Sequence, residues 1–225
     1  TAAGGTGPVT WIGWAVGEDG PTVITTGGDR ATVRSATALE VLHEVALDAP
    51  IVHAALDPEG TRLATAGADG TVSFFDPADL SREGEPVRTG STETTGVSFS
   101  PDGEQVATVN ADGTLQIVDA SGGGIRATFA LEGLPTRVAW SPSGDVVAVG
   151  SSDGAMWLFS APSLELIGNA SVTGSAVASL FWTADGSALV SSHENGYTHR
   201  TTVWTTFAAC EALRAVLPAD EMDRL

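Results

Sequence analysis

The sequence lacks lysine, because all ten of its basic residues are arginine. Chemistry that needs a lysine amine, such as Schiff-base formation, is therefore excluded within these 225 residues. Cysteine is nearly absent too. Cys210 stands alone, so no internal disulfide can form, and a reducing compartment such as the bacterial cytoplasm is expected. No run of 18 apolar residues occurs, so no membrane insertion is expected.

Positive charge is the second deficit. The chain has 28 acidic residues against ten basic ones, a net charge of −18. A field of this sign repels phosphate backbones and anionic lipid surfaces, so nucleic acid and membranes are not expected as partners. Basic proteins and cations are favoured instead. The arginine-only, alanine- and glycine-rich usage is typical of a GC-rich bacterium.

Glycine is abundant, with 27 residues, and much of it recurs at a fixed spacing. Turn motifs such as SPDG recur every 40 to 43 residues and end at Gly20, Gly60, Gly103, Gly144 and Gly186. Nine residues after each of these glycines stands an acid or its amide, namely Asp29, Asp69, Asp112, Asp153 and Asn195. In every copy but the first, glycine follows that residue. This regularity indicates a fivefold internal repeat.

Each repeat is predicted to be β-structure. Short alternating runs such as IVHAALDP, RLATAG and TVSFFD are separated by turn residues, and Asp-Gly between two such runs favours a tight hairpin. A fourth run follows in three copies: LEVLHEVAL, IRATFAL and ELIGNASV. Four strands in about 42 residues, repeated, predict an all-β fold, a β-propeller of about five four-stranded antiparallel blades.

The stretch SPDG…VATVNADGTLQIVD at 100–119 resembles the repeat of the WD40 family. The resemblance covers roughly residues 8–205, as repeats 8–47, 48–90, 91–131, 132–173 and 174–205. The family's Gly-His is missing, and its Trp-Asp position reads FD at 75–76, VD at 118–119 and FS at 159–160. The hydroxyl of the family's hydrogen-bond network is kept at Thr25, Thr65, Thr108 and Ser191 and lost at Val149. The resemblance therefore implies an incomplete network and more dependence on packing.

The number of repeats raises the question of closure. Members of the family most often have seven blades, so residues 1–205 are interpreted as a fragment of a larger propeller, with a complete five-bladed ring as the alternative. Residues 206–225 are expected to form a helical tail with Cys210 buried. Trp204, Ala209 and Cys210 resemble the C-terminal end of bacterial, actinobacterial-type WD40 signalling proteins, which implies an upstream effector domain.

The acids of the repeated turn are the candidate site residues. A short carboxylate can accept backbone N–H groups and hold its own turn, so a structural role is the first interpretation. The functional interpretation is a ring of acids on one face that binds a partner. Its members are Asp29, Asp69, Asp112, Asp153 and Glu194.

Other motifs are weaker. GSSDG at 150–154 matches the G-x-S-x-G of hydrolases, but a turn between strands is the wrong setting for it. His193 and His199 flank a turn with Glu194 but lack a third ligand, so no metal or other cofactor is expected. His53 is interpreted as a packed or edge strand residue. Strand tryptophans are assigned to the core: Trp14, Trp140, Trp157 and Trp182.

The resemblance implies a non-catalytic scaffold or sensor that binds a protein partner, or an upstream domain of its own polypeptide, in bacterial signalling. The alternative is a propeller-type hydrolase or lactonase, or a small-ligand binder, with a metal in the central channel. That alternative needs carboxylates or histidines that converge from several blades. At matched positions the sequence offers only the turn acids.

Overall fold

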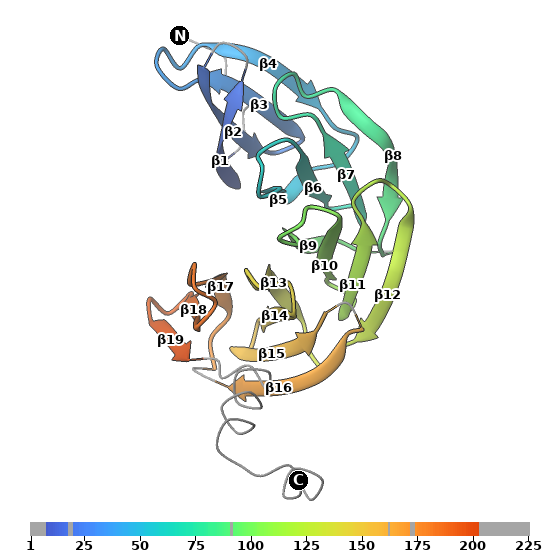
Figure 1. Cartoon of the computed structure of the whole chain (residues 1–225), viewed down its shortest axis with the longest axis vertical. Helices are drawn as coiled ribbons and strands as arrows, with labels where there is room; N and C mark the ends of the chain where they lie inside the picture. The colour runs from blue at the N-terminus through green and yellow to red at the C-terminus, as the bar shows by residue number, and fades with distance from the viewer. Residues whose placement is uncertain (1–7, 18–19, 91, 162, 172–173, 203–225) are drawn as a thin grey trace, which may run out of the picture.

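The computed structural model describes residues 8–202 apart from 18–19, 91, 162 and 172–173. The described residues form five antiparallel sheets, each built from consecutive strands, and no helix. Figure 1 shows the sheets following one another as the blades of a propeller. The predicted all-β, five-bladed fold is thereby confirmed. The helical tail predicted for 206–225, including Cys210, lies outside the described residues.

Strands run outward from the centre in sequence order within each blade. The first blade comprises β1 (Trp11–Gly17), β2 (Gly20–Gly27), β3 (Arg30–Ser35) and β4 (Val41–Ala46). The second comprises β5 (Ile51–Leu56), β6 (Leu63–Gly67), β7 (Thr71–Phe75) and β8 (Arg82–Arg88). The third comprises β9 (Thr94–Phe99), β10 (Gln105–Asn110), β11 (Thr114–Asp119) and β12 (Gly124–Ala130). The fourth comprises β13 (Pro135–Trp140), β14 (Val146–Ser151), β15 (Ala155–Ser160) and β16 (Glu165–Ser171). The fifth has three described strands, β17 (Val177–Trp182), β18 (Ala188–His193) and β19 (Thr198–Thr202).

The fourth strand of the second repeat, β8, is not evident from the sequence. Its segment REGEPVR contains glycine and proline, which are poor strand residues. The structure places β8 at the outer edge of its sheet, paired only with β7. An edge strand tolerates Pro86 because one side of its backbone needs no ladder partner. The edge position therefore allows β8 to form although its glycine and proline disfavour a strand.

The turns place their residues on two opposite sides of the propeller. We call the turn between the first two strands of a blade its first turn, and the turn between the second and third strands its second turn. Because the strands are antiparallel, first turns lie at one end of the blades and second turns at the other. The repeat glycines, such as Gly60 and Gly103, end the first turns with positive φ. The glycines after the repeat acids, such as Gly70 and Gly113, do the same in the second turns.

Apolar clusters between neighbouring blades form the core. One cluster joins each consecutive pair of blades, and Phe75, Phe74, Phe159 and Leu189 mark the four clusters from the first pair to the last. Every blade thus depends on its neighbours for burial, as in other repeat architectures.

Hydrogen bonds between inner strands repeat along the array. The Thr95 hydroxyl donates to the Pro135 carbonyl at 2.9 Å, and the Thr136 hydroxyl donates to the Val177 carbonyl at 2.8 Å. The two threonines occupy the same register position in neighbouring repeats. These bonds fix how far each blade is displaced from the next.

The hydroxyls retained from the WD40 network do not complete it. Thr65 donates weakly to the carbonyl of Ser73 at 3.5 Å, and the buried Thr108 hydroxyl has no hydrogen-bond partner. Ser191 bonds to the ring of His193 at 3.0 Å instead. Packing between blades therefore carries the stability that this network lacks.

Trp14 corrects one sequence-based assignment. It lies on β1 and is 67 % exposed, whereas Phe99, which holds the same register position in the third blade, is 7 % exposed. Phe99 packs in the cluster that joins its blade to the preceding one, whereas no described blade precedes the first. The prediction that Trp14 belongs to the core was wrong, because no described blade packs on the face of β1 that carries it.

Candidate functional site

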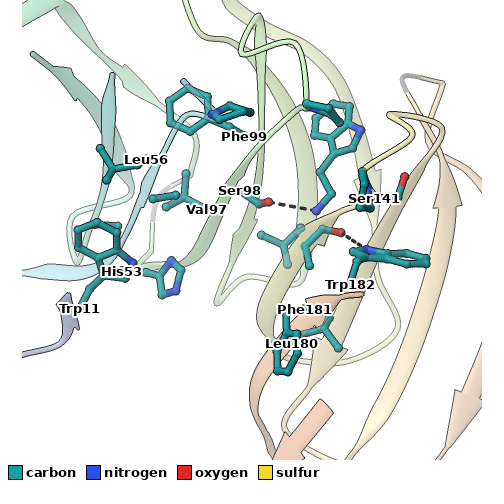
Figure 2. A pocket seen from close by; sticks show the side chains of 18 residues that line it. Trp11, His53, Leu56, Val97, Ser98, Phe99, Ser141, Leu180, Phe181 and Trp182 are labelled. Carbon is teal, nitrogen blue, oxygen red and sulfur yellow. Dashed lines mark hydrogen bonds between the residues drawn. The ribbon is translucent and has the colours of Figure 1, made fainter. Parts of the chain in front are cut away.

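The inner strands enclose a cavity of about 590 Å³ on the concave side of the arc. Figure 2 shows aromatic and aliphatic side chains from several blades directed toward it. It extends from β5 across β9 and β13 to β17, with a contribution from β1. Most of its lining is apolar, and Phe181 within it is 53 % exposed. Such a surface can bind an apolar side chain of another molecule.

The repeat itself builds this lining. The position four residues before the glycine of the first turn is large and apolar in four repeats and faces the cavity in all of them. These residues are Leu56, Phe99, Trp140 and Trp182. Prolines follow shortly after in three copies, at Pro58, Pro101 and Pro142, and line the cavity at its first-turn end.

Hydrogen bonds hold the two indoles of this series in place. The Trp140 Nε1 donates to the Gly144 carbonyl at 3.0 Å within its own first turn. The Trp182 Nε1 donates to the Ala139 carbonyl at 3.1 Å on the neighbouring inner strand. Since their polar atoms are satisfied inside the protein, both rings offer mainly apolar surface to the cavity. A fixed aromatic surface reduces the conformational entropy that binding would cost.

His53 is the only ionisable side chain in the described lining of this cavity. Its Nδ1 is buried and has no hydrogen-bond partner. Burial first, and then the positive charge of Arg137, lower the pKa of His53 from 6.5 to about 4. The imidazole is therefore neutral at pH 7, and one of its nitrogens is left to bond to a bound group.

The low pKa of His53 makes the folded state sensitive to acid. The unfolded chain takes up this proton near pH 6.5 and the folded chain only near pH 4, so stability is present above pH 6.5 and is lost as the pH falls toward 4. We expect His53→Gln to reduce the loss of unfolding free energy between pH 7 and pH 5 by up to about 2 kcal/mol. Urea unfolding at both pH values measures it. His43→Gln, on exposed β4, is the matched control for the same substitution outside the cavity.

Arg137 lies on β13 at the register position of His53, but its charge is engaged by backbone. Its Nε donates to the Ala178 carbonyl at 2.7 Å and a terminal nitrogen donates to the Thr136 carbonyl at 2.6 Å. Burial lowers the pKa of Arg137, and the negative charge of Glu194 opposes that shift. Arg137 therefore helps to join the fourth and fifth blades.

The candidate acids of the second turns are largely occupied by their own turns. Asp69 accepts the backbone N–H of Thr71 at 3.1 Å and its hydroxyl at 2.7 Å. Asp112 does the same with Thr114, at 3.2 and 2.6 Å. Asp153 accepts the N–H of Ala155 at 3.0 Å and the hydroxyl of Ser151. This is the geometry of the structural interpretation.

Asp29 in the first blade and Glu194 in the fifth differ from this pattern. Asp29 lies 3.9 Å from Arg30, which stands where the other repeats have glycine. In the fifth blade Asn195, rather than Glu194, accepts the turn N–H, from Tyr197 at 3.2 Å. Glu194 acts on Arg137 through its charge. The five residues are thus on equivalent turns without forming one uniform set.

The remaining sequence motifs occupy structural positions. His193 is buried, with one ring nitrogen 3.0 Å from the Ser175 carbonyl and the other 3.0 Å from the Ser191 hydroxyl, and its ring meets that of His199 edge-on at 5.9 Å. GSSDG spans the second turn between β14 and β15, not a strand-to-helix elbow. Among the described residues no three His, Cys, Asp or Glu side chains gather closely enough to hold a metal ion.

The concave cavity itself was missed in the sequence. Trp140 is buried in the core as predicted, and Trp182 packs against a core cluster. From the sequence a central channel was expected only as an alternative, and a cavity shared by these residues and His53 was not predicted. The available signal was the large apolar residue repeated four positions before each turn glycine. Periodicity alone cannot tell whether such a residue packs between blades or faces the centre, because both positions require an apolar side chain.

Two family models match parts of the chain. Residues 43–76 and 84–119 each match the WD domain, G-beta repeat, and residues 138–206 match the WD40 domain of anaphase-promoting complex subunit 4. No curated protein matches the chain. No helix in the described part is long and apolar enough to cross a membrane. Propellers of this kind are generally non-catalytic and typically bind proteins. From the five blades and these matches, we conclude that the chain is a WD40-repeat β-propeller.

Proposed function

We propose that the concave cavity is a docking site for a segment of another protein. The observation that carries this proposal is an apolar cavity of about 590 Å³ built by the inner strands, with Phe181 left 53 % exposed inside it. Its volume lies within the range of about 300–1,000 Å³ that is typical of binding pockets. Aromatic residues fixed by packing are the usual anchors of such interfaces.

A selection experiment tests this proposal. A random 12-residue peptide library displayed on phage is selected against the chain and against Phe181→Ser, which removes apolar lining from an exposed position. We expect the enriched peptides to lose about tenfold or more of their affinity for Phe181→Ser. Tyr197→Ser is the matched control, since Tyr197 is an exposed aromatic residue of the same blade that does not line the cavity. Equal loss in both variants, or in neither, would contradict the assignment.

The cellular setting is a further part of this proposal. We infer a cytoplasmic scaffold or sensor of a bacterial signalling protein, whose partner is a separate protein or an upstream domain of the same polypeptide. The single cysteine supports a reducing compartment, and the arginine-only, alanine- and glycine-rich usage supports a bacterial source. A binding role for Asp29, Asp69, Asp112, Asp153 and Glu194 stays a prediction. Their turn hydrogen bonds leave fewer free lone pairs for a ligand.

We also propose that these blades belong to a larger propeller. The exposed face of β1 supports this, because the same register positions are covered by a neighbouring blade in the repeats that follow. A further blade packed on β1 would bury Ile12 as Ala54 and Val97 are buried in the repeats that follow.

This arrangement predicts that the same substitution at equivalent positions of two blades has unequal effects on the free energy of unfolding. Ile12 pairs with Thr25 as Val97 pairs with Thr108, and Ile12 is exposed. In the 225-residue chain, Ile12→Ser should change the unfolding free energy by less than about 0.5 kcal/mol, whereas Val97→Ser should cost about 2–3 kcal/mol through a lost apolar contact and a buried hydroxyl. Chemical unfolding followed by circular dichroism measures both. A large cost for Ile12→Ser would mean that Ile12 is already covered in this chain.

A further inference from the structure

The concave cavity continues into a second apolar hollow. This hollow, of about 330 Å³, lies between the first turns of the first two blades. Trp14, Val16 and Pro21 line it from the first blade, and Leu56 and Pro58 line both the hollow and the concave cavity. The two hollows therefore form one groove, the concave groove, which runs from the fifth blade to the first along the first-turn side. Its length suits an extended segment better than a compact small molecule.

The first-turn side of the groove is acidic. Asp57 and Glu59 line the second hollow directly. Asp57 accepts hydrogen bonds from Thr61 and Arg62 in its own turn, so it adds negative charge, and the direct contact with a partner is assigned to Glu59. Each first turn from the second repeat to the fifth contributes acids to this side, namely Asp57, Glu59, Asp102, Glu104, Asp145 and Asp185. The Ser100 hydroxyl lowers the pKa of Asp102, and the Thr183 hydroxyl lowers the pKa of Asp185 to about 2, so both carboxylates stay ionised at neutral pH.

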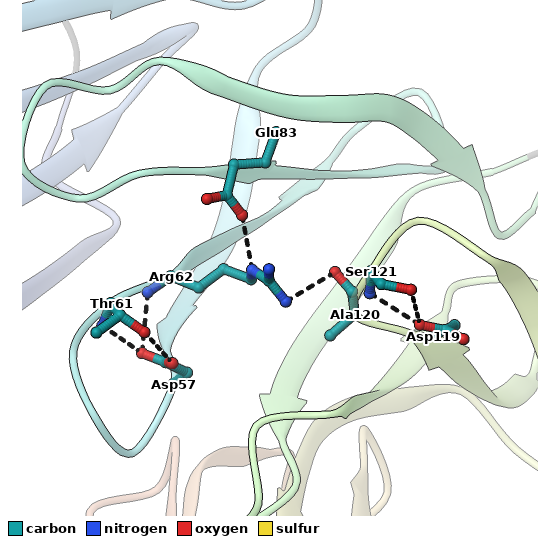
Figure 3. A network of polar contacts seen from close by, with 7 residues as sticks. All are labelled: Asp57, Thr61, Arg62, Glu83, Asp119, Ala120 and Ser121. Carbon is teal, nitrogen blue, oxygen red and sulfur yellow. Dashed lines mark hydrogen bonds and ion pairs between the residues drawn. The ribbon is translucent and has the colours of Figure 1, made fainter.

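Three arginines of the second and third blades are engaged in other contacts. Arg62 pairs with Glu83 at 2.7 Å and donates to the Ala120 carbonyl of the next blade at 3.2 Å, as Figure 3 shows. Arg126 pairs with Asp119, and Arg82 lies over the ring of Phe75 at 5.6 Å. These cations cannot neutralise the first-turn acids without breaking internal contacts. The negative charge beside the groove is left for a partner.

His53 adds an independent sign that the groove takes a ligand. The ring contacts the backbone of Val97, but its buried Nδ1 has no hydrogen-bond partner among the described residues, which leaves the burial of this atom uncompensated. An N–H group of an extended backbone placed beside the inner strands would satisfy it. The apolar surface of Phe99 and Trp182 lies in the same cavity for the neighbouring side chain.

We propose that the concave groove binds an extended protein segment in which an apolar anchor residue is flanked by arginine or lysine. The anchor enters the cavity between Phe99 and Trp182, a backbone N–H of the segment bonds to His53, and a basic side chain reaches the acids around Glu59. This inference rests on the proposed docking function and adds the chemistry of the partner.

Three labelled 11-residue peptides in a Gly-Ser background test it by fluorescence polarisation. The first has a central Phe with two Arg on each side, the second has Glu in place of Arg, and the third keeps Arg but has Ser in place of Phe. We expect the Arg–Phe peptide to bind at least about tenfold more tightly than either of the others. Its affinity should fall several-fold between about 50 and 500 mM salt, because exposed charge pairs are screened.

Matched variants distinguish peptide binding in the groove from general electrostatic attraction of the peptide to an acidic protein. Glu59→Gln should weaken the Arg–Phe peptide about two- to fivefold, the effect of one exposed charge pair. Glu165→Gln makes the same charge change on β16, away from the groove, and should leave affinity unchanged. Equal weakening by both variants, or binding that survives Phe181→Ser, would overturn the proposal as non-specific attraction.

The outcomes also separate this inference from the docking function. If the Glu–Phe peptide binds as tightly as the Arg–Phe peptide and both need Phe181, the groove is a docking site and the basic chemistry of its partner is wrong. If neither peptide binds and no library peptide depends on Phe181, the docking function itself fails.

Discussion

Phe74→Ala is expected to lower the free energy of unfolding by about 3–5 kcal/mol, one of the largest effects of any single substitution in this chain. Phe74 lies on β7, is 1 % exposed and meets Phe99 edge-on with 6.3 Å between ring centroids. The two rings belong to the second and third blades and to one apolar cluster. Truncation would leave a cavity between two blades whose closure is opposed by the hydrogen bond from Arg62 of the second blade to the Ala120 carbonyl of the third.

Denaturant unfolding followed by far-ultraviolet circular dichroism measures this loss. Because blades contact only their neighbours, a weakened contact in the middle of the array should also broaden the transition. Phe181→Ala is the control, since the same truncation at a 53 % exposed ring should cost less than about 1 kcal/mol. A cost below about 1 kcal/mol for Phe74→Ala would show that the blades are stabilised by something other than packing between sheets.

The contrast between Phe74 and Phe181 shows which features of the structure could be predicted from the sequence and which could not. The repeat, the strand alternation and the Asp-Gly hairpins follow from local chemistry, so five antiparallel blades could be predicted from them. Whether a ring lies between blades or inside the concave groove depends on where the sheets stand relative to one another. No property of the two phenylalanines within their own strands distinguishes these positions.

The candidate site shows the same limit. Asp69 and Asp112 could be located from the repeat, and a role within their own turns follows from side-chain length alone. The concave groove could not be located, since its residues come from strands far apart in the chain. The uncompensated Nδ1 of His53 is visible only when the neighbouring inner strands are in place.

Gly70→Ala should be the other severe substitution, with a cost of about 3 kcal/mol or more. Gly70 has φ of +78°, a region that costs a residue with a Cβ about 1–2 kcal/mol. A Cβ here would also lie 2.5 Å from the Thr92 carbonyl oxygen and 2.6 Å from that of Gly90. Both oxygens belong to the segment that leads into β9, and the backbone N–H groups of Thr89 and Gly90 donate to the Gly70 carbonyl. The collision would push this segment away and break both bonds.

Gly196→Ala is the matched control because it changes the equivalent glycine of the fifth blade. Its φ is +86°, but nothing lies within 4 Å of an added Cβ, so only the backbone cost of about 1–2 kcal/mol is expected. Unfolding midpoints of the two variants compare the effects directly. Two separate reasons then explain glycine in the repeated turn. The positive φ favours glycine in every blade that keeps it. At Gly70 the segment that leads into β9 also lies too close to leave room for a Cβ. Equal costs at both positions would mean that conformation alone explains the motif.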